Sequence, residues 1–297
     1  MAGVRTRRSR WAGEAAGLLR SVRWRLEGRD LALIAAGLTF YAGIAVVPLL
    51  VVAFALTARL SSPDTVRELG ERLTELLPDQ LGAPAAVARL ISAGISLGVW
   101  GGLLALLPMS LYGEGLRRAL LRFGGRRESL TSWRGRLLAL PLLALTPLLL
   151  YPLLLAAEQM AELAETGGAG ANVGRIALGF YSVLAVLLVP LAWGFRVVAG
   201  SPVGWPALLV GVFLTAASLS GFLQGFVLFL SLPLDLGAPF GGLTAVGSVV
   251  AIALWLFLLH LVLLVGWLFT QALDERLSRR RTAAADSAPS APTRSGG

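Results

Sequence analysis

The chain has 297 residues, of which 56% are hydrophobic and only 14% are charged. A soluble domain carries about 25% charged residues, so this composition indicates a polytopic membrane protein. Cysteine is absent and His260 is the single histidine, which argues against disulfides, thiol chemistry and a zinc site. The formal charge of +9 is carried by arginine, because the sequence contains no lysine.

Residues 1–30 form a basic segment whose apolar positions recur at helical spacing. These positions are Trp11, Ala15, Leu18, Val22 and Leu26. The spacing predicts an amphipathic helix lying on the membrane surface, on the cytoplasmic side. A solvated helix packed on the membrane domain is the alternative.

Six long apolar segments follow, and we expect each of them to cross the membrane. The first carries no charge over about 28 residues, so at about 1.5 Å per residue it spans a hydrocarbon core of about 30 Å with length to spare. The predicted spans are 31–58, 87–112, 137–157, 176–199, 205–232 and 243–270. They define a membrane domain over residues 31–276, and the Ala, Ser, Pro and Arg composition of residues 277–297 predicts a disordered cytoplasmic tail.

Between the first two spans lies a short acidic segment that ends near Asp79. Ser62-Pro63-Asp64 has the residues that start a helix: a capping hydroxyl, a proline in the first turn and an acid near the positive end of the helix dipole. We therefore expect a small helical cap outside the membrane. In the second span, glycines at positions 94, 98 and 102 predict close approach of another helix.

The distribution of arginine predicts the orientation. An even number of spans places both termini on one side, and that side would hold 21 arginines against five on the other. The positive-inside rule then places both termini in the cytoplasm. The fold class is therefore all-α, a six-helix transmembrane bundle with an amphipathic N-terminal helix and a small extracytoplasmic cap.

Polar residues inside the predicted spans are the candidates for a transport pathway. They are Thr39, Tyr41, Gln224 and His260, with Pro48 opening the backbone of the first span. His260 could equally be a hydrogen-bonding partner of a neighbouring helix, and Gln224, between two glycines, fits helix packing better than a pathway.

The basic loop after the second span is a candidate site for anionic headgroups. The arginines concerned are Arg117, Arg118, Arg122, Arg126 and Arg127. Guanidinium groups bind phosphate well, so membrane lipids are the expected partners. The alternative is that these residues only determine topology.

A nuclease would need clustered carboxylates or a histidine–lysine pair. The predicted spans contain no acid and the chain no lysine, so we expect neither nucleic-acid binding nor hydrolysis. No nucleotide-binding motif is present, and we expect no catalytic residue, no metal site and no cofactor.

Three motifs in order resemble the YihY/BrkB family. They are residues 35–41 (AAGLTFY) followed by 46–48 (VVP), residues 113–120 (GEGLRRAL), and residues 240–243 (FGGL) followed by 253–256 (ALWL) and 264–266 (LVG). The chain departs from the family pattern at Ala45, Thr244 and Leu268, where a serine, a glycine and an acid are usual.

The resemblance implies a six-helix protein of the bacterial inner membrane. Members have carried the label ribonuclease BN, regarded as a misassignment, and some are discussed as lipid exporters. Our leading hypothesis is a permease-like protein that moves a lipid or amphiphile. The alternative is a non-transporting scaffold that docks a partner or anionic lipid through its arginine-rich face. A cavity reaching mid-membrane and lined by Tyr41, Gln224 and His260 would favour transport.

Overall fold

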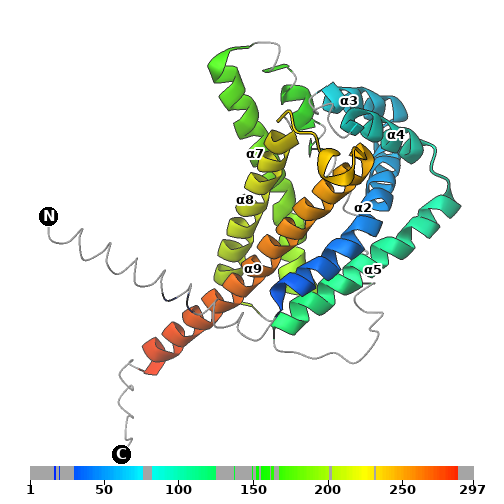
Figure 1. Cartoon of the computed structure of the whole chain (residues 1–297). Helices are drawn as coiled ribbons and strands as arrows, with labels where there is room; N and C mark the ends of the chain where they lie inside the picture. The colour runs from blue at the N-terminus through cyan, green and yellow to red at the C-terminus, as the bar shows by residue number, and fades with distance from the viewer. Residues whose placement is uncertain are drawn as a thin grey trace, which may run out of the picture.

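The computed structural model describes residues 30–75, 82–124, 167–200, 203–230 and 232–286, together with a few single residues and short pieces of the segments between them. Within these ranges the protein is all-α (Figure 1). The order of elements is α2 (Leu31–Leu60), α3 (Pro63–Glu75), α4 (Ala83–Ile95), α5 (Val99–Phe123), α7 (Gly168–Trp193), η2 (Gly194–Val198), α8 (Trp205–Leu230), η3 (Ala238–Phe240) and α9 (Thr244–Asp286). The predicted N-terminal helix and most of the predicted third span lie outside the described residues.

Helix α2 confirms the predicted first span. Asp30 caps its start, because the Asp30 carboxylate accepts a hydrogen bond of 2.9 Å from the Leu33 amide. The helix ends at Leu60, and the amide of Ser61 donates to the Thr57 carbonyl. Pro48 lies inside the helix, as predicted.

The predicted second span is not one continuous helix, because a break at residues 96–98 divides it into α4 and α5. The Ser96 amide and hydroxyl both donate to the Ser92 carbonyl and terminate α4, and extended backbone at Gly98 starts α5. Of the three spaced glycines only Gly94 meets another helix, since a Cβ there would press on Phe54 of α2. Nothing lies within 4 Å of a Cβ placed on Gly98 or Gly102.

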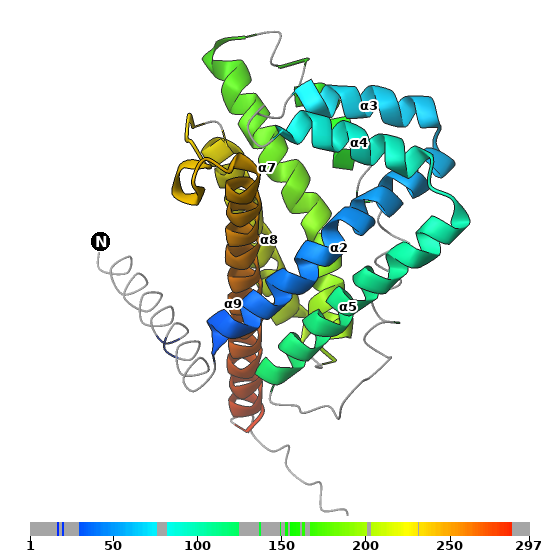
Figure 2. The ribbon, with the colours of Figure 1, turned by 45° about the vertical axis from the view of Figure 1, so that its right-hand side comes forward.

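Helices α3 and α4 form the cap at one end of α2 (Figures 1 and 2). The predicted helix start is confirmed: the Thr65 amide donates to the Ser62 hydroxyl over 3.1 Å. The apolar face of α3 is buried against α4 and the end of α2 through Phe54, Val66, Leu69 and Ile91, which belong to a small separate core cluster. The cap therefore consists of two helices rather than one.

Four of the described helical segments are long and apolar enough to cross a membrane: α2, α7 with η2, α8, and most of α9. Helix α8 packs between α7 and α9, and α2 packs against both α5 and α9 (Figure 2). Helix α7 begins at Gly168, eight residues before the predicted fourth span. Helix α9 continues to Asp286, so the first residues of the predicted disordered tail are helical.

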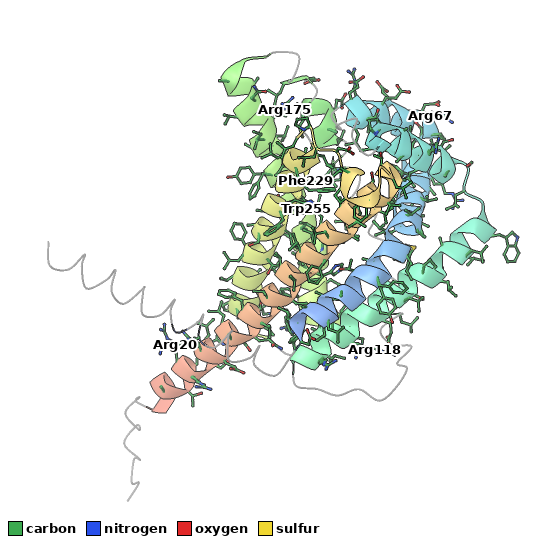
Figure 3. The ribbon with its side chains drawn as sticks, viewed as in Figure 1. Arg20, Arg67, Arg118, Arg175, Phe229 and Trp255 are labelled. Atoms are coloured by element: carbon green, nitrogen blue, oxygen red, sulfur yellow. The ribbon has the colours of Figure 1, made fainter. Side chains whose placement is uncertain are left out.

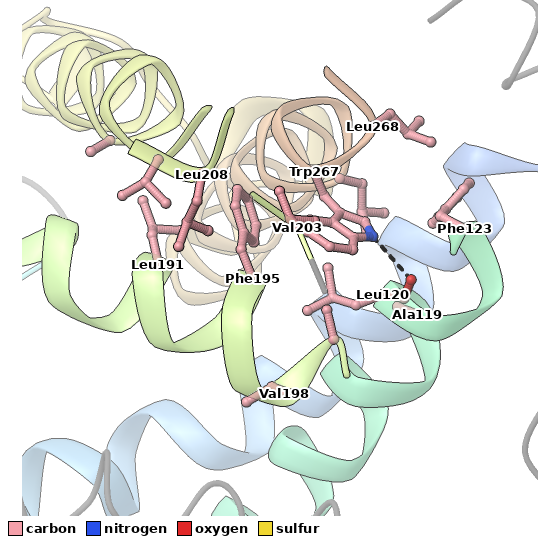
Figure 4. Packing of buried hydrophobic residues seen from close by; sticks show 14 of the residues in the cluster. Ala119, Leu120, Phe123, Leu191, Phe195, Val198, Val203, Leu208, Trp267 and Leu268 are labelled. Atoms are coloured by element: carbon pink, nitrogen blue, oxygen red, sulfur yellow. Dashed lines mark hydrogen bonds between the residues drawn. The ribbon is translucent and has the colours of Figure 1, made fainter. Parts of the chain in front are cut away.

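The main core lies where α2, α5, the end of α7, α8 and α9 meet, and Figure 4 shows part of it. Trp267 of α9 is fully buried and stacks at a tilt on Phe195, with ring centroids 5.1 Å apart. Its indole N–H donates to the Leu120 carbonyl of α5 over 3.0 Å. A buried indole needs such a partner, so this hydrogen bond fixes where α9 crosses α5.

Helices α8 and α9 contact each other through two reciprocal glycine–threonine pairs. A Cβ on Gly211 of α8 would overlap Thr270 of α9, and a Cβ on Gly266 of α9 would overlap Thr215 of α8. Both threonine hydroxyls donate to the carbonyl four residues earlier, each over 2.7 Å, so neither leaves a donor unpaired. Small residues at such a crossing let the backbones approach closely.

Replacing either glycine by alanine should separate the two helices. We expect Gly211→Ala and Gly266→Ala each to lower the free energy of unfolding by about 1–3 kcal/mol, the cost of overpacking a tight contact. Unfolding in mixed micelles titrated with SDS measures this quantity. The matched control is Gly43→Ala, at an exposed helical glycine with nothing within 4 Å. Equal stability of Gly266→Ala and Gly43→Ala would contradict the packing.

Candidate functional site

A polar cluster of Thr39, Tyr112 and His260 joins α2, α5 and α9 inside the bundle. His260 is 4% exposed. Its Nδ1 lies 2.6 Å from the Leu256 carbonyl and 3.3 Å from the Thr39 hydroxyl, and its Nε2 lies 3.2 Å from the Tyr112 hydroxyl. The Thr39 hydroxyl donates to the Ala35 carbonyl over 2.8 Å. Three helices are therefore tied together through one imidazole.

A cavity of about 480 Å³ lies beside this cluster and is called the central cavity below. Its walls come from α2, α5, α7, η2, α8 and α9, with Leu149 contributing from a segment that is otherwise not described. Typical wall residues are Ala45, Met109, Val186, Phe195, Leu223 and Leu263. Tyr112 and His260 are the only polar side chains among the described lining residues. Ligand sites commonly have volumes of about 300–1,000 Å³.

The structure brings together only part of the predicted pathway. His260 lines the central cavity. Thr39 does not line the cavity but contacts the His260 imidazole. Tyr41 instead packs on Gly115, at the contact between α2 and α5. Pro48 does not line the cavity, although its neighbour Leu49 does.

Gln224 points toward α7, where its amide lies against Gly179. The cavity is therefore not the polar route that Tyr41, Gln224 and His260 together would have formed. The packing interpretation of Gln224 fits this position, since its side chain fills space between α7 and α8. At the contact of α8 with α9, Trp255 packs on Phe229 and its neighbours (Figure 3).

The predicted headgroup arginines separate into inward and outward positions. Arg117 is only 8% exposed, and its guanidinium donates to the Val198 carbonyl of η2 over 2.9 Å. Arg118 and Arg122 are exposed on α5, and Arg118 lies at the end of the helix far from the cap (Figure 3). Arg126 and Arg127 lie outside the described residues.

Sequence reasoning missed Glu114, because the second span was expected to end at Tyr112. Helix α5 continues to Phe123, so Glu114 lies in the same helix as the second half of the predicted second span. Glu114 is 7% exposed; its Oε1 binds Arg118 over 2.7 Å, and its Oε2 has no hydrogen-bond partner among the described residues. The four-residue spacing of Glu114 and Arg118 on a helix is the sequence signal that could have revealed the pair.

The end of α7 widens into the π-helix η2, and the side of the central cavity that η2 lines is called its floor below. The Ala199 amide donates to the Gly194 carbonyl over 2.8 Å, which closes this wider turn. The widened turn places Gly194, Phe195 and Val198 on the cavity wall. Short π-helical segments are common at functional sites, and here the loosened backbone forms the floor of the cavity.

Two arginines hold the backbone around this π-helix. Arg117 binds the Val198 carbonyl, and Arg196 donates to the Val203 carbonyl while its guanidinium lies 4.8 Å from the ring centre of Trp205. The Asp274 carboxylate accepts from the Gly204 amide over 2.9 Å. Charged side chains therefore satisfy backbone groups that the change from helix to turn leaves free.

Removing the inward arginine should destabilise this region. Arg117→Ala leaves the buried Val198 carbonyl without a strong donor, and an unsatisfied buried polar group costs about 1–3 kcal/mol. SDS titration should show a loss of unfolding free energy of that size. Arg122→Ala, at an exposed position five residues further along α5, is the control and should leave stability unchanged. A variant at Arg117 as stable as the one at Arg122 would show that the hydrogen bond to η2 contributes nothing.

The family model described as Virulence factor BrkB matches residues 22–291. No curated protein and no solved structure matches the chain. The family match extends over all the elements described above and confirms the resemblance seen in the three sequence motifs. This chain, a multi-pass membrane protein by its apolar helices, belongs to the virulence factor BrkB family.

Proposed function

We propose that this protein is a permease of the cytoplasmic membrane that moves a lipid or another amphiphile between the two leaflets. The observation that carries the proposal is the central cavity, which is large enough for a ligand and lies within the bundle. An apolar cavity without several polar partners does not hold water well. A hydrocarbon chain is therefore a better occupant than an ion, a sugar or a column of water.

The rest of the architecture is part of the same proposal. Helix α5 and the segment around residues 137–157 would add to the four long apolar helices and complete six spans. Arg118 lies at one end of the bundle and Arg67 and Arg175 at the other (Figure 3). The arginine-rich end, where α2 begins and α9 ends, would face the cytoplasm of a bacterium. The cap of α3 and α4 would then lie outside.

A substrate lipid would divide between two environments. Its chain would lie in the cavity, and its headgroup would pass the exposed arginines at the end of α5. Arg117 does not fit this headgroup role, because its guanidinium donates to the Val198 carbonyl of η2. A transporter needs two alternating conformations, and the π-helix beside the cavity floor is the element best suited to change shape.

The second candidate function is a scaffold that binds an anionic partner without transporting anything. The observation in its favour is the exposed arginine run on the last turns of α9, at positions 279, 280 and 281. A scaffold would not need an internal cavity. In neither case do we propose an enzymatic reaction.

A variant whose side chain fills the central cavity distinguishes the permease from the scaffold. Val186 and Val189 lie three residues apart on α7: the first lines the cavity, and the second is 47% exposed on the surface of the bundle. We expect Val186→Trp to abolish lipid movement, because the indole occupies the cavity, and Val189→Trp to leave it unchanged. The assay uses liposomes with fluorescently labelled phosphatidylglycerol, phosphatidylethanolamine or a neutral glucosyl diacylglycerol. Chemical quenching of the outer leaflet reports movement.

The outcomes differ clearly between the candidates. Movement of at least one labelled lipid that Val186→Trp removes and Val189→Trp keeps supports the permease. If none of the three lipids moves faster than in protein-free liposomes, the permease proposal fails. Replacement of Arg279, Arg280 and Arg281 by alanine should leave movement intact, whereas the scaffold function would depend on these residues.

A further inference from the structure

The hydrogen bonds of His260 define which of its nitrogens carries the proton. Nδ1 lies 2.6 Å from the Leu256 carbonyl, which can only accept, so Nδ1 must carry a hydrogen. In the neutral ring Nε2 is then an acceptor, and the Tyr112 hydroxyl, 3.2 Å away, donates to it. A neutral imidazole satisfies every partner in the polar cluster, and no counter-charge is required.

This arrangement uses every donor that the cluster possesses. The Tyr112 hydrogen goes to His260, the His260 hydrogen goes to Leu256, and the Thr39 hydrogen goes to Ala35. Within the described part of the chain the lone pairs of the Tyr112 oxygen remain free, and Tyr112 is one of the residues that line the central cavity. Among the described lining side chains, the central cavity therefore offers the Tyr112 oxygen as an acceptor, but no free donor and no charge.

An anionic group would be unstable in such a cavity. A phosphate or carboxylate needs donors or a cation, and burial of an ion without them is far more costly than burial of a neutral group. An ammonium group would find an acceptor but no counter-charge among the described lining residues. A hydroxyl is the group that fits, because it is neutral and brings the donor that Tyr112 lacks.

The shape of the cavity indicates what is attached to that hydroxyl. One face of α5 lines the cavity continuously from Met109 through Tyr112 and Leu116 to Leu120. The eleven helical rises from Met109 to Leu120 correspond to about 16 Å, and about 12 Å of this wall extends beyond Tyr112 toward the arginine-rich end. An apolar wall of this length accommodates an extended alkyl chain.

We propose that the central cavity binds one alkyl chain and one hydroxyl group of an uncharged amphiphile, with the hydroxyl on the Tyr112 oxygen and the chain along α5. The inference rests on the proposed function, since it names the class of molecule that the cavity selects. Anionic lipids would leave their headgroups outside the cavity. The Tyr112 hydroxyl is a specificity-determining contact, and His260 positions it by accepting its hydrogen.

Three probes with the same chain length test this site. They are 1-hexadecanol, its methyl ether 1-methoxyhexadecane, which lacks the donor, and palmitate at pH 8, which is charged. Each competes with radiolabelled 1-hexadecanol for the purified full-length protein, at matched mole fractions in detergent micelles. We expect the alcohol to compete about five-fold better than the ether, the effect of one neutral hydrogen bond, and palmitate to compete least.

Two variants assign the preference to residues. Tyr112→Phe should reduce binding of the alcohol to that of the ether and leave the ether unchanged. Val186→Trp should weaken all three probes, and Val189→Trp none. Equal binding of alcohol and ether by the unmodified protein would overturn the inference, and so would strongest binding of palmitate. The comparison of alcohol with ether needs no variant, so it decides the question even if Tyr112→Phe does not fold.

Binding and transport can fail independently. If the alcohol is preferred but no labelled lipid moves in liposomes, the site stands and the permease function falls. If lipids move but alcohol and ether bind equally, the function stands and the hydroxyl site falls.

Discussion

Three polar side chains inside this bundle bind groups on other helices, and the arrangement of the fold depends on these contacts. Lipid supplies no hydrogen bonds, so an unpaired group within the membrane is costly. The indole of Trp267 binds α5, the hydroxyl of Ser220 binds the Phe180 carbonyl of α7 over 2.7 Å, and the imidazole of His260 links α2, α5 and α9. Each of these contacts fixes a helix crossing, and the crossings leave the central cavity between them.

Charge and polarity are separated along the length of the bundle. The neutral cluster around His260 adjoins the apolar cavity, whereas arginines surround the π-helix at its floor. Glu114 is the exception, because one of its oxygens is buried and unpaired among the described residues. The separation matches what an amphiphile presents, with a chain that avoids charge and a headgroup that tolerates it. The proposed function and the proposed hydroxyl contact both follow from this match.

The sequence predicted features that depend on local chemistry. Apolar length and flanking charge located α2, and the Ser62-Pro63-Asp64 start located α3, because these signals act within a few residues. The break at residues 96–98 was missed, since Ser96 and Gly98 can continue a helix as readily as end it. Spaced glycines predicted one long packed span, yet only Gly94 has a neighbour, which is a tertiary property.

The candidate site was predicted in part for the same reason. The single buried histidine stood out by its chemistry, but polarity alone does not reveal the direction in which a side chain points. Tyr41 faces Gly115 and Gln224 faces α7, while Tyr112, which was not singled out, completes the cluster. Glu114 was not identified as a candidate, because the predicted second span ended two residues before it.

A density map of the full-length protein in lipid nanodiscs, at a resolution that shows side chains, tests the central cavity most directly. The account predicts an elongated non-protein density along α5 from Tyr112 toward Leu120, in contact with the tyrosine hydroxyl. Side chains of the protein itself filling the space between α5, α7 and α9 would contradict it.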